Sequence, residues 1–126
     1  MLLDSNIIIY AAQPQHEFLR EYLSTIPMEV SAISKVETLG YSVLSEAEKE
    51  YLEEFFRMVV VLPLEESVLN RATLLRQQRK MSLGDALIAG TALAYNLTLI
   101  TRNTQDFRWV DGLKLIDPFK KDSTSD

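Results

Sequence analysis

The chain alternates short apolar runs with longer segments in which apolar residues recur at helical spacing. The short runs predict strands at residues 1–3, 29–33, 59–62, 97–100 and 113–116. The strand at 59–62 is the clearest, because it is β-branched, uncharged and followed by proline. The periodic segments predict helices at residues 7–10, 15–24, 34–44, 45–58, 65–80 and 83–95, with a loop or short helix at 101–112. This alternation predicts an α/β fold with a mainly parallel sheet of four to five strands and helices on both faces.

Three acidic residues occupy positions that such a sheet would bring to one edge. Asp4 follows the first predicted strand, Glu37 comes one helical turn after the second, and Asp85 lies in the first turn of the apolar helix 83–95. Thr101 and Asn103 directly follow the strand at 97–100. In open parallel sheets, functional groups gather beyond the carboxyl ends of the strands, where the strand order reverses. We therefore expect the three carboxylates to share one pocket.

Carboxylates that lie close together repel one another, so such a cluster favours a bound cation. The chain has no cysteine and one histidine, His16, to which we assign no catalytic role. Oxygen ligands alone suit a hard ion such as Mg²⁺ or Mn²⁺. An ion of this kind supports hydrolysis of phosphodiesters by a metal-activated water. Asp4, Glu37 and Asp85 are thus predicted as catalytic and metal-binding residues.

A purely structural role for the same acids stays open. Ser34-x-x-Glu37 and Ser82-x-x-Asp85 both have the spacing of a helix capping box, in which the acid accepts hydrogen bonds from backbone N–H groups. Asp4 could in the same way cap the helix that begins near Asn6. Because a carboxylate has two oxygens, capping and metal binding are compatible.

Composition is that of a globular protein, and charge is unevenly distributed. The 126 residues are 47% hydrophobic, lack an apolar run long enough for a membrane span and begin without a leader-like segment, so we expect a cytoplasmic protein. The net charge of −5 disfavours nucleic-acid binding, yet residues 71–108 contain six basic and two acidic side chains, a balance of 6 − 2 = +4. Arg79, Lys80 and Arg102 are candidate RNA contacts, although a solvated helix face explains Arg79 and Lys80 equally well.

Five segments resemble, in order and spacing, the PIN domain and specifically the VapC-like toxins of toxin–antitoxin pairs: LLDSNIIIY, SKVETLGY, SLGDALIAGTAL, LITRNTQDF and LKLIDPF. The resemblance implies a three-layer α/β/α domain at residues 1–118, followed by a polar tail at 119–126 that we expect to be disordered. It also implies an endoribonuclease that depends on Mg²⁺ or Mn²⁺, an RNA substrate, a homodimer and an inhibitory antitoxin.

Position by position, Asp4, Glu37 and Asp85 match the acidic residues of the family's metal site. Thr101 matches a residue whose hydroxyl supports that site, and Asn6 is a further supporting candidate. Asn103 stands where many members have a fourth aspartate, which predicts weaker metal affinity or a compensating role for Asp106.

Two other functions remain possible from the sequence. A PIN-like domain with weak activity could act as a protein- or RNA-binding module, as the missing fourth acid suggests. A flavodoxin-like or phosphatase-like enzyme with Asp4 as nucleophile would need a phosphate-binding glycine loop, and the four glycines are not clustered.

The apolar residues between 18 and 56 could form a groove for an antitoxin helix or fill the core. Phe107 and Trp109 could likewise stack on bases or belong to the core.

Overall fold

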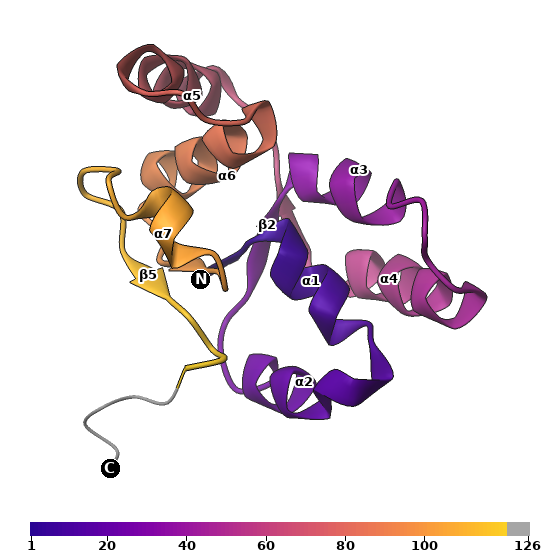
Figure 1. The fold of residues 1–126 in the computed structure, drawn as a ribbon. Helices are drawn as coiled ribbons and strands as arrows, with labels where there is room; N and C mark the ends of the chain where they lie inside the picture. The colour runs from indigo at the N-terminus through magenta and orange to yellow at the C-terminus, as the bar shows by residue number, and fades with distance from the viewer. Residues whose placement is uncertain (121–126) are drawn as a thin grey trace.

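A five-stranded parallel sheet forms the centre of the computed structural model, which describes residues 1–120 (Figure 1). Its strands are β1 (Leu2–Leu3), β2 (Glu29–Ser31), β3 (Val60–Leu62), β4 (Leu99–Ile100) and β5 (Leu115–Ile116). They lie in the order β3-β2-β1-β4-β5, and every neighbouring pair is parallel. The predicted parallel sheet is therefore confirmed, with the last strand at one edge, although each strand is shorter than its apolar run.

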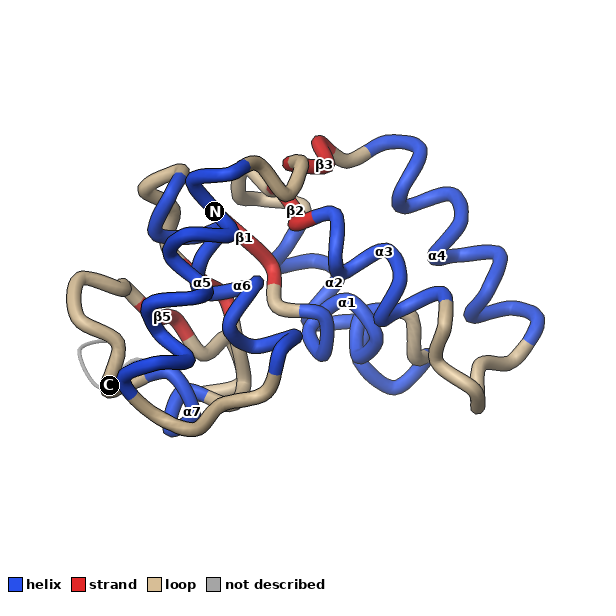
Figure 2. The backbone as a smooth tube through the Cα atoms, turned by 90° about the horizontal axis from the view of Figure 1, so that it is seen from above, coloured by secondary structure: helices blue, strands red, loops and turns tan. Residues whose placement is uncertain are grey.

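The helices lie on both sides of the sheet. They are α1 (Ser5–Ala11), the 3-10 turn η1 (Pro14–His16), α2 (Glu17–Leu23), α3 (Ala32–Leu39), α4 (Glu46–Met58), α5 (Glu66–Gln78), α6 (Leu83–Ala94) and α7 (Thr104–Phe107). Figures 1 and 2 show α1 to α4 on one side of the strands and α5 to α7 on the other. No helix within residues 1–120 is both long enough and apolar enough to cross a membrane.

The core has two parts, because successive side chains of the central strands point to alternate faces of the sheet. Leu2 and Leu99 accordingly pack in a cluster with residues of α5, α6 and α7. Leu3 and Ile100 pack with residues of α1, α2 and α4. The result is the predicted three-layer arrangement, and the apolar faces of α2 and α4 mainly fill the core.

The predicted boundary between the second strand and the following helix is wrong. Helix α3 begins at Ala32, and Ser31, which has an extended backbone, is its N-cap with an Oγ that accepts from the Ile33 N–H at 3.4 Å. Ser34 therefore lies inside the helix, and the proposed capping box between Ser34 and Glu37 does not exist. The apolar Ile33 extended the strand-like pattern by two residues, whereas in the structure it packs as a helical residue.

The predicted helix at 34–44 also ends early, at Leu39, with Gly40 as its C-cap. Val36 and Val43, which the periodicity placed on an apolar face, are 68% and 69% exposed. Helix α4 starts independently, because Ser45 and Glu48 form a complete capping box.

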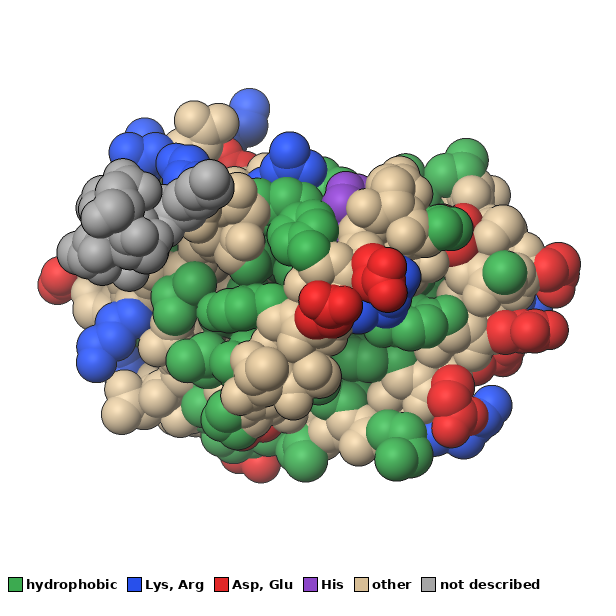
Figure 3. Space-filling view, turned by 90° about the horizontal axis from the view of Figure 1, so that it is seen from below, with side chains coloured by type: hydrophobic (Ala, Val, Ile, Leu, Met, Phe, Trp, Pro, Cys, Tyr) green, Lys and Arg blue, Asp and Glu red, His purple; other side chains and the backbone are tan. Residues whose placement is uncertain are grey.

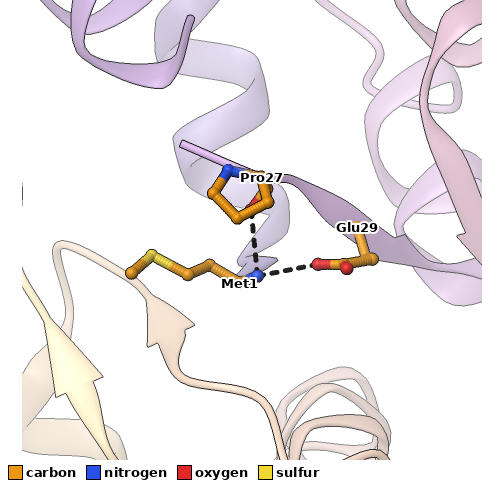
Figure 4. A network of polar contacts seen from close by, with 3 residues as sticks. All are labelled: Met1, Pro27 and Glu29. Atoms are coloured by element: carbon orange, nitrogen blue, oxygen red, sulfur yellow. Dashed lines mark hydrogen bonds and ion pairs between the residues drawn. The ribbon is translucent and has the colours of Figure 1, made fainter. Parts of the chain in front are cut away.

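The two ends of the described chain are both tied to the fold. The Met1 amino group donates to the Glu29 Oε2 at 2.7 Å and to the Pro27 carbonyl at 2.9 Å, where β1 and β2 begin (Figure 4). Phe119 packs edge-on against the rings of Tyr10 and Phe18. Phe119, the first residue of the predicted tail, thus packs on the domain, and residues 121–126 of that tail lie outside the described residues.

Candidate active site

The strand order reverses at β1, and the first candidate residues lie at this point. From β1 the chain proceeds to β2 and β3 on one side, and then to β4 and β5 on the other. Asp4 and Thr101 follow the adjacent strands β1 and β4, and the Asp4 N–H donates to the Ile100 carbonyl at 2.9 Å. The Thr101 hydroxyl donates to the Asp4 Oδ2 at 2.8 Å, and the Asn103 N–H donates to the Thr101 Oγ1 at 3.0 Å. Topology thus connects residues that are 97 positions apart.

Asp4 is a buried acid with a strongly altered pKa. It occupies the N-cap position of α1, but its carboxylate accepts no capping hydrogen bond, and the residue is 5% exposed. Burial raises its pKa from the usual 3.8 to about 6, and the negative charges of Asp85 and Glu37 add to the rise. The hydrogen bond from Thr101 acts in the opposite direction. The structure therefore does not use this carboxylate as the helix cap that the sequence allowed.

Glu37 lies on the exposed surface of α3, where Ser5 bonds its carboxylate and Gly84 lies next to it. The Ser5 hydroxyl donates to the Glu37 Oε1 at 2.7 Å, and the Ser5 and Ser34 oxygens are 2.9 Å apart. A Cβ atom added at Gly84, in the first turn of α6, would collide with the Glu37 Oε2. Glycine at this position therefore leaves room for the carboxylate.

The sequence pattern suggested Ser34 only as a helix cap and gave Gly84 no role, although each carries a further signal. Ser34 precedes Glu37 by one helical turn, so both lie on the same side of α3. Gly84 interrupts a segment of leucine and alanine, where glycine costs about 0.5–1 kcal/mol relative to alanine. A glycine in an otherwise strong helix former needs a reason, and the contact with Glu37 supplies one.

Asp85 lies at the start of α6, and neighbouring acids influence its pKa. Its N–H donates to the Ser82 Oγ at 3.1 Å, which is one half of the predicted capping box; the reciprocal bond to its carboxylate is not formed. Burial raises the pKa of Asp85, and the charges of Asp106 and Glu37 raise it further, while a hydrogen bond with the Ser82 side chain lowers it. Asp106, in the first turn of α7, is exposed.

The electrostatic coupling of these acids suits a divalent cation. Within residues 1–120, the ion pairs join Met1 to Glu29 and Arg57 to Glu54, so no Lys or Arg side chain forms an ion pair with the clustered acids. As the side chains lie, no three His, Cys, Asp or Glu residues in this part of the chain could together hold a metal ion. Mg²⁺ usually takes one or two carboxylates and keeps several waters. An ion at this site would therefore have at most two direct carboxylate ligands from the residues as they lie, with water completing its coordination.

The remaining candidates are spread around this site. Asn103 is the half-buried N-cap of α7, while Asn6 on α1 is exposed. The Arg102 guanidinium lies over the rings of Phe119 and Tyr10, at 4.2 and 5.3 Å from their centroids. Arg79, Lys80, Trp109 and Phe107 complete the set. Arg79 lies over the Trp109 ring at 5.4 Å and Lys80 is exposed, whereas Phe107 is 1% exposed and belongs to the core.

Comparison with known proteins finds the same fold over nearly the whole chain. A family model described as the PIN domain matches residues 1–113. A tRNA(fMet)-specific endonuclease VapC from Shigella flexneri is 29% identical, with 92% of this chain and 96% of that protein aligned. A toxin–antitoxin complex from Klebsiella pneumoniae contains a chain with a TM-score of 0.73 and 29% identity, covering 95% of this chain and 98% of that one. FitAcB from Neisseria gonorrhoeae gives a TM-score of 0.76 and 27% identity, covering 95% and 99%.

Proposed function

Since the chain belongs to the PIN domain family, we propose that it is an endoribonuclease dependent on Mg²⁺ or Mn²⁺ and the toxin of a VapBC-type pair. The observation that carries the proposal is Asp4, a buried carboxylate that is coupled electrostatically to Asp85 and Glu37 and, among residues 1–120, has no cationic side chain paired with it. Such an arrangement opposes folding in the absence of a cation, so it is best explained by a metal site.

The chain's own residues would position the ion and the substrate. Asp4 and Asp85 offer the more buried oxygens, Thr101 orients the Asp4 carboxylate, and Ser5 orients the exposed carboxylate of Glu37. When bound, a divalent ion supplies a water of lowered pKa and neutralises charge on the phosphodiester. Asn103 provides an amide where a fourth acid would add negative charge, which favours weaker metal binding. Asp106 lies close enough to Asp85 to influence it and is the candidate for compensation.

Partners follow from the relatives, since the Klebsiella pneumoniae structure is a toxin–antitoxin complex. The described surface exposes apolar side chains that an antitoxin helix could cover, namely Phe18, Val36, Tyr41 and Val43. A homodimer and RNA contacts by Arg79, Lys80 and Arg102 are further parts of this proposal.

One observation favours a weaker activity. Asn103 is neutral, and no three acids within residues 1–120 converge on one point as they lie. A domain that binds RNA or protein with little cleavage would have these features.

RNA cleavage by the wild-type chain and by Asp4→Asn distinguishes the two functions. We expect wild type to cleave in Mg²⁺ or Mn²⁺ and not in EDTA, and Asp4→Asn to be at least about 100-fold slower because a metal ligand is lost. Asp111→Asn, the same change at an exposed acid, should cleave like wild type. Equal rates for Asp4→Asn and wild type would reject the metal site. Absence of cleavage by wild type in both metals would favour the binding module.

A further inference from the structure

A basic surface lies at the end of helix α5, just before the first turn of α6 that contains Asp85. The end of α5 and the turn after it line a surface hollow with Arg76, Gln77, Gln78, Arg79, Lys80 and Met81, and no acidic side chain contributes to this lining. The Arg76 Nε donates to the Met81 carbonyl at 3.3 Å, and the next residue, Ser82, is the N-cap of α6. We call Arg76, Arg79 and Lys80, together with Trp109, the basic turn.

The cations of the basic turn have no acidic partner. Within residues 1–120, none of the three forms an ion pair, although the chain has an excess of acidic residues. The acids are concentrated elsewhere: residues 1–70 contain four basic and twelve acidic side chains, and in Figure 3 most red side chains lie on the side of α3 and α4. Three exposed, unpaired cations beside a cluster of carboxylates favour a polyanionic ligand at this place.

Trp109, within the basic turn, contacts both Arg79 and Asp106. The Arg79 guanidinium carbon lies 5.4 Å from the centroid of the Trp109 ring. The Trp109 Nε1 donates to the Asp106 carbonyl at 3.1 Å, and the Asp106 charge influences Asp85. A stacked guanidinium keeps its N–H groups free for phosphate, and a half-buried indole offers a surface for a base. The Arg102 guanidinium is stacked in the same way, over Phe119 and Tyr10.

We propose that the basic turn binds a single-stranded segment of the RNA next to the cleaved phosphodiester, with phosphates on Arg79 and Lys80 and a base against Trp109. This inference rests on the proposed ribonuclease function and adds the path of the strand. A single strand is specified because a base can stack on a side chain only when it is not stacked within a duplex.

Fluorescence of Trp109, the one tryptophan of the chain, tests the proposal directly. Asp4→Asn protein, which binds without cleaving, is titrated with a single-stranded RNA of about 12 nucleotides and with a duplex of the same sequence. We expect the single strand to quench the fluorescence and to bind more tightly than the duplex. Adding Arg79→Ala and Lys80→Ala should weaken binding by about 10-fold or more and make it less dependent on salt, since each phosphate contact contributes about 0.7 to the salt slope of a single strand.

The matched control removes two charges elsewhere, by Lys49→Ala with Arg57→Ala on α4, and should change affinity less than 2-fold. Equal weakening by both pairs would show a nonspecific charge effect and overturn the proposal. So would binding without a change in Trp109 fluorescence, or equal affinity for the duplex. Trp109→Phe, read out by fluorescence anisotropy of labelled RNA, should retain more affinity than Trp109→Ala. Because these titrations measure binding alone, their failure leaves the cleavage test of Asp4 untouched.

Discussion

The first turn and the middle of helix α6 have opposite physical characters. In the middle, seven consecutive residues from Ala86 to Ala92 are buried, and Gly90 brings α6 against the backbone of α5. In the first turn, Gly84 lies against the carboxylate of Glu37, and Asp85 has a raised pKa. One helix thus contains a segment packed for stability and a segment at which like charges gather at the expense of stability.

The two glycines show this difference most directly. A Cβ atom at Gly90 would lie 2.8 Å from the Val68 carbonyl oxygen and 3.1 Å from the Ala72 nitrogen, which are backbone atoms. A Cβ atom at Gly84 would meet the end of a flexible side chain, Glu37. The same added methyl group should therefore destabilise the fold at Gly90 and disturb the site at Gly84.

Asp4→Asn should give the largest effect, with stability and function changing in opposite directions. The pKa of Asp4 rises from 3.8 to about 6 on folding, so the folded protein binds more protons between these values. In the metal-free wild type, stability should fall as the pH increases from about 4 to about 6, by up to about 3 kcal/mol. The neutral amide avoids this loss, so Asp4→Asn should be more stable than wild type at pH 7.5 and similar at pH 4.

Urea unfolding in EDTA at both pH values measures the difference, and titration with Mn²⁺ should show at least about 100-fold weaker binding by the variant. An Asp4→Asn protein that is less stable than wild type at pH 7.5 would contradict the account of Asp4 as a strained acid.

Gly90→Ala should have the next largest effect, on stability alone. The methyl group must displace the backbone of α5, at a cost of about 1–3 kcal/mol that outweighs the better helix propensity of alanine. Urea unfolding gives this loss, while Mn²⁺ affinity at low denaturant should match that of wild type. Stability equal to wild type would mean that α5 and α6 separate more easily than their packing indicates.

Gly84→Ala should weaken metal binding without lowering the stability of the fold. Stability should stay unchanged or rise by about 0.5–1 kcal/mol, because the helix gains a better residue and Glu37 can rotate away. Mn²⁺ affinity should fall by about 10-fold, because the displaced carboxylate loses its hydrogen bond from Ser5.

A double-mutant cycle with Glu37→Ala separates this cause from others. In the Glu37→Ala protein, the added Gly84→Ala change should have no effect on Mn²⁺ affinity, since its partner is gone. Equal losses in both backgrounds would show that Gly84 acts independently of Glu37.

The sequence predicted the α/β alternation and the strand-end positions of Asp4 and Thr101, because both depend on local patterns and a general rule of parallel sheets. It misplaced the start of α3, because Ile33 continues an apolar run and Ser34 has the spacing of a cap, while the actual cap is Ser31. The sequence did not predict that Glu37 lies next to Ser5 and Gly84. These contacts join three helices that periodicity describes one at a time.

Thr101→Val should produce the smallest effect, a displacement of the pH dependence of Mn²⁺ affinity. The Thr101 hydroxyl lowers the pKa of Asp4, so its removal should raise that pKa further, by no more than about one unit for a hydrogen bond of about 1 kcal/mol. Because the carboxylate must be deprotonated to bind a metal, the rise of Mn²⁺ affinity with pH should move to higher pH. Thr101→Ser keeps the hydroxyl and should follow the wild-type curve. If the serine variant were displaced and the valine variant were not, the hydroxyl would not be what orients Asp4, and the buried methyl group of Thr101, which valine keeps and serine lacks, would be the feature that shapes this side of the site.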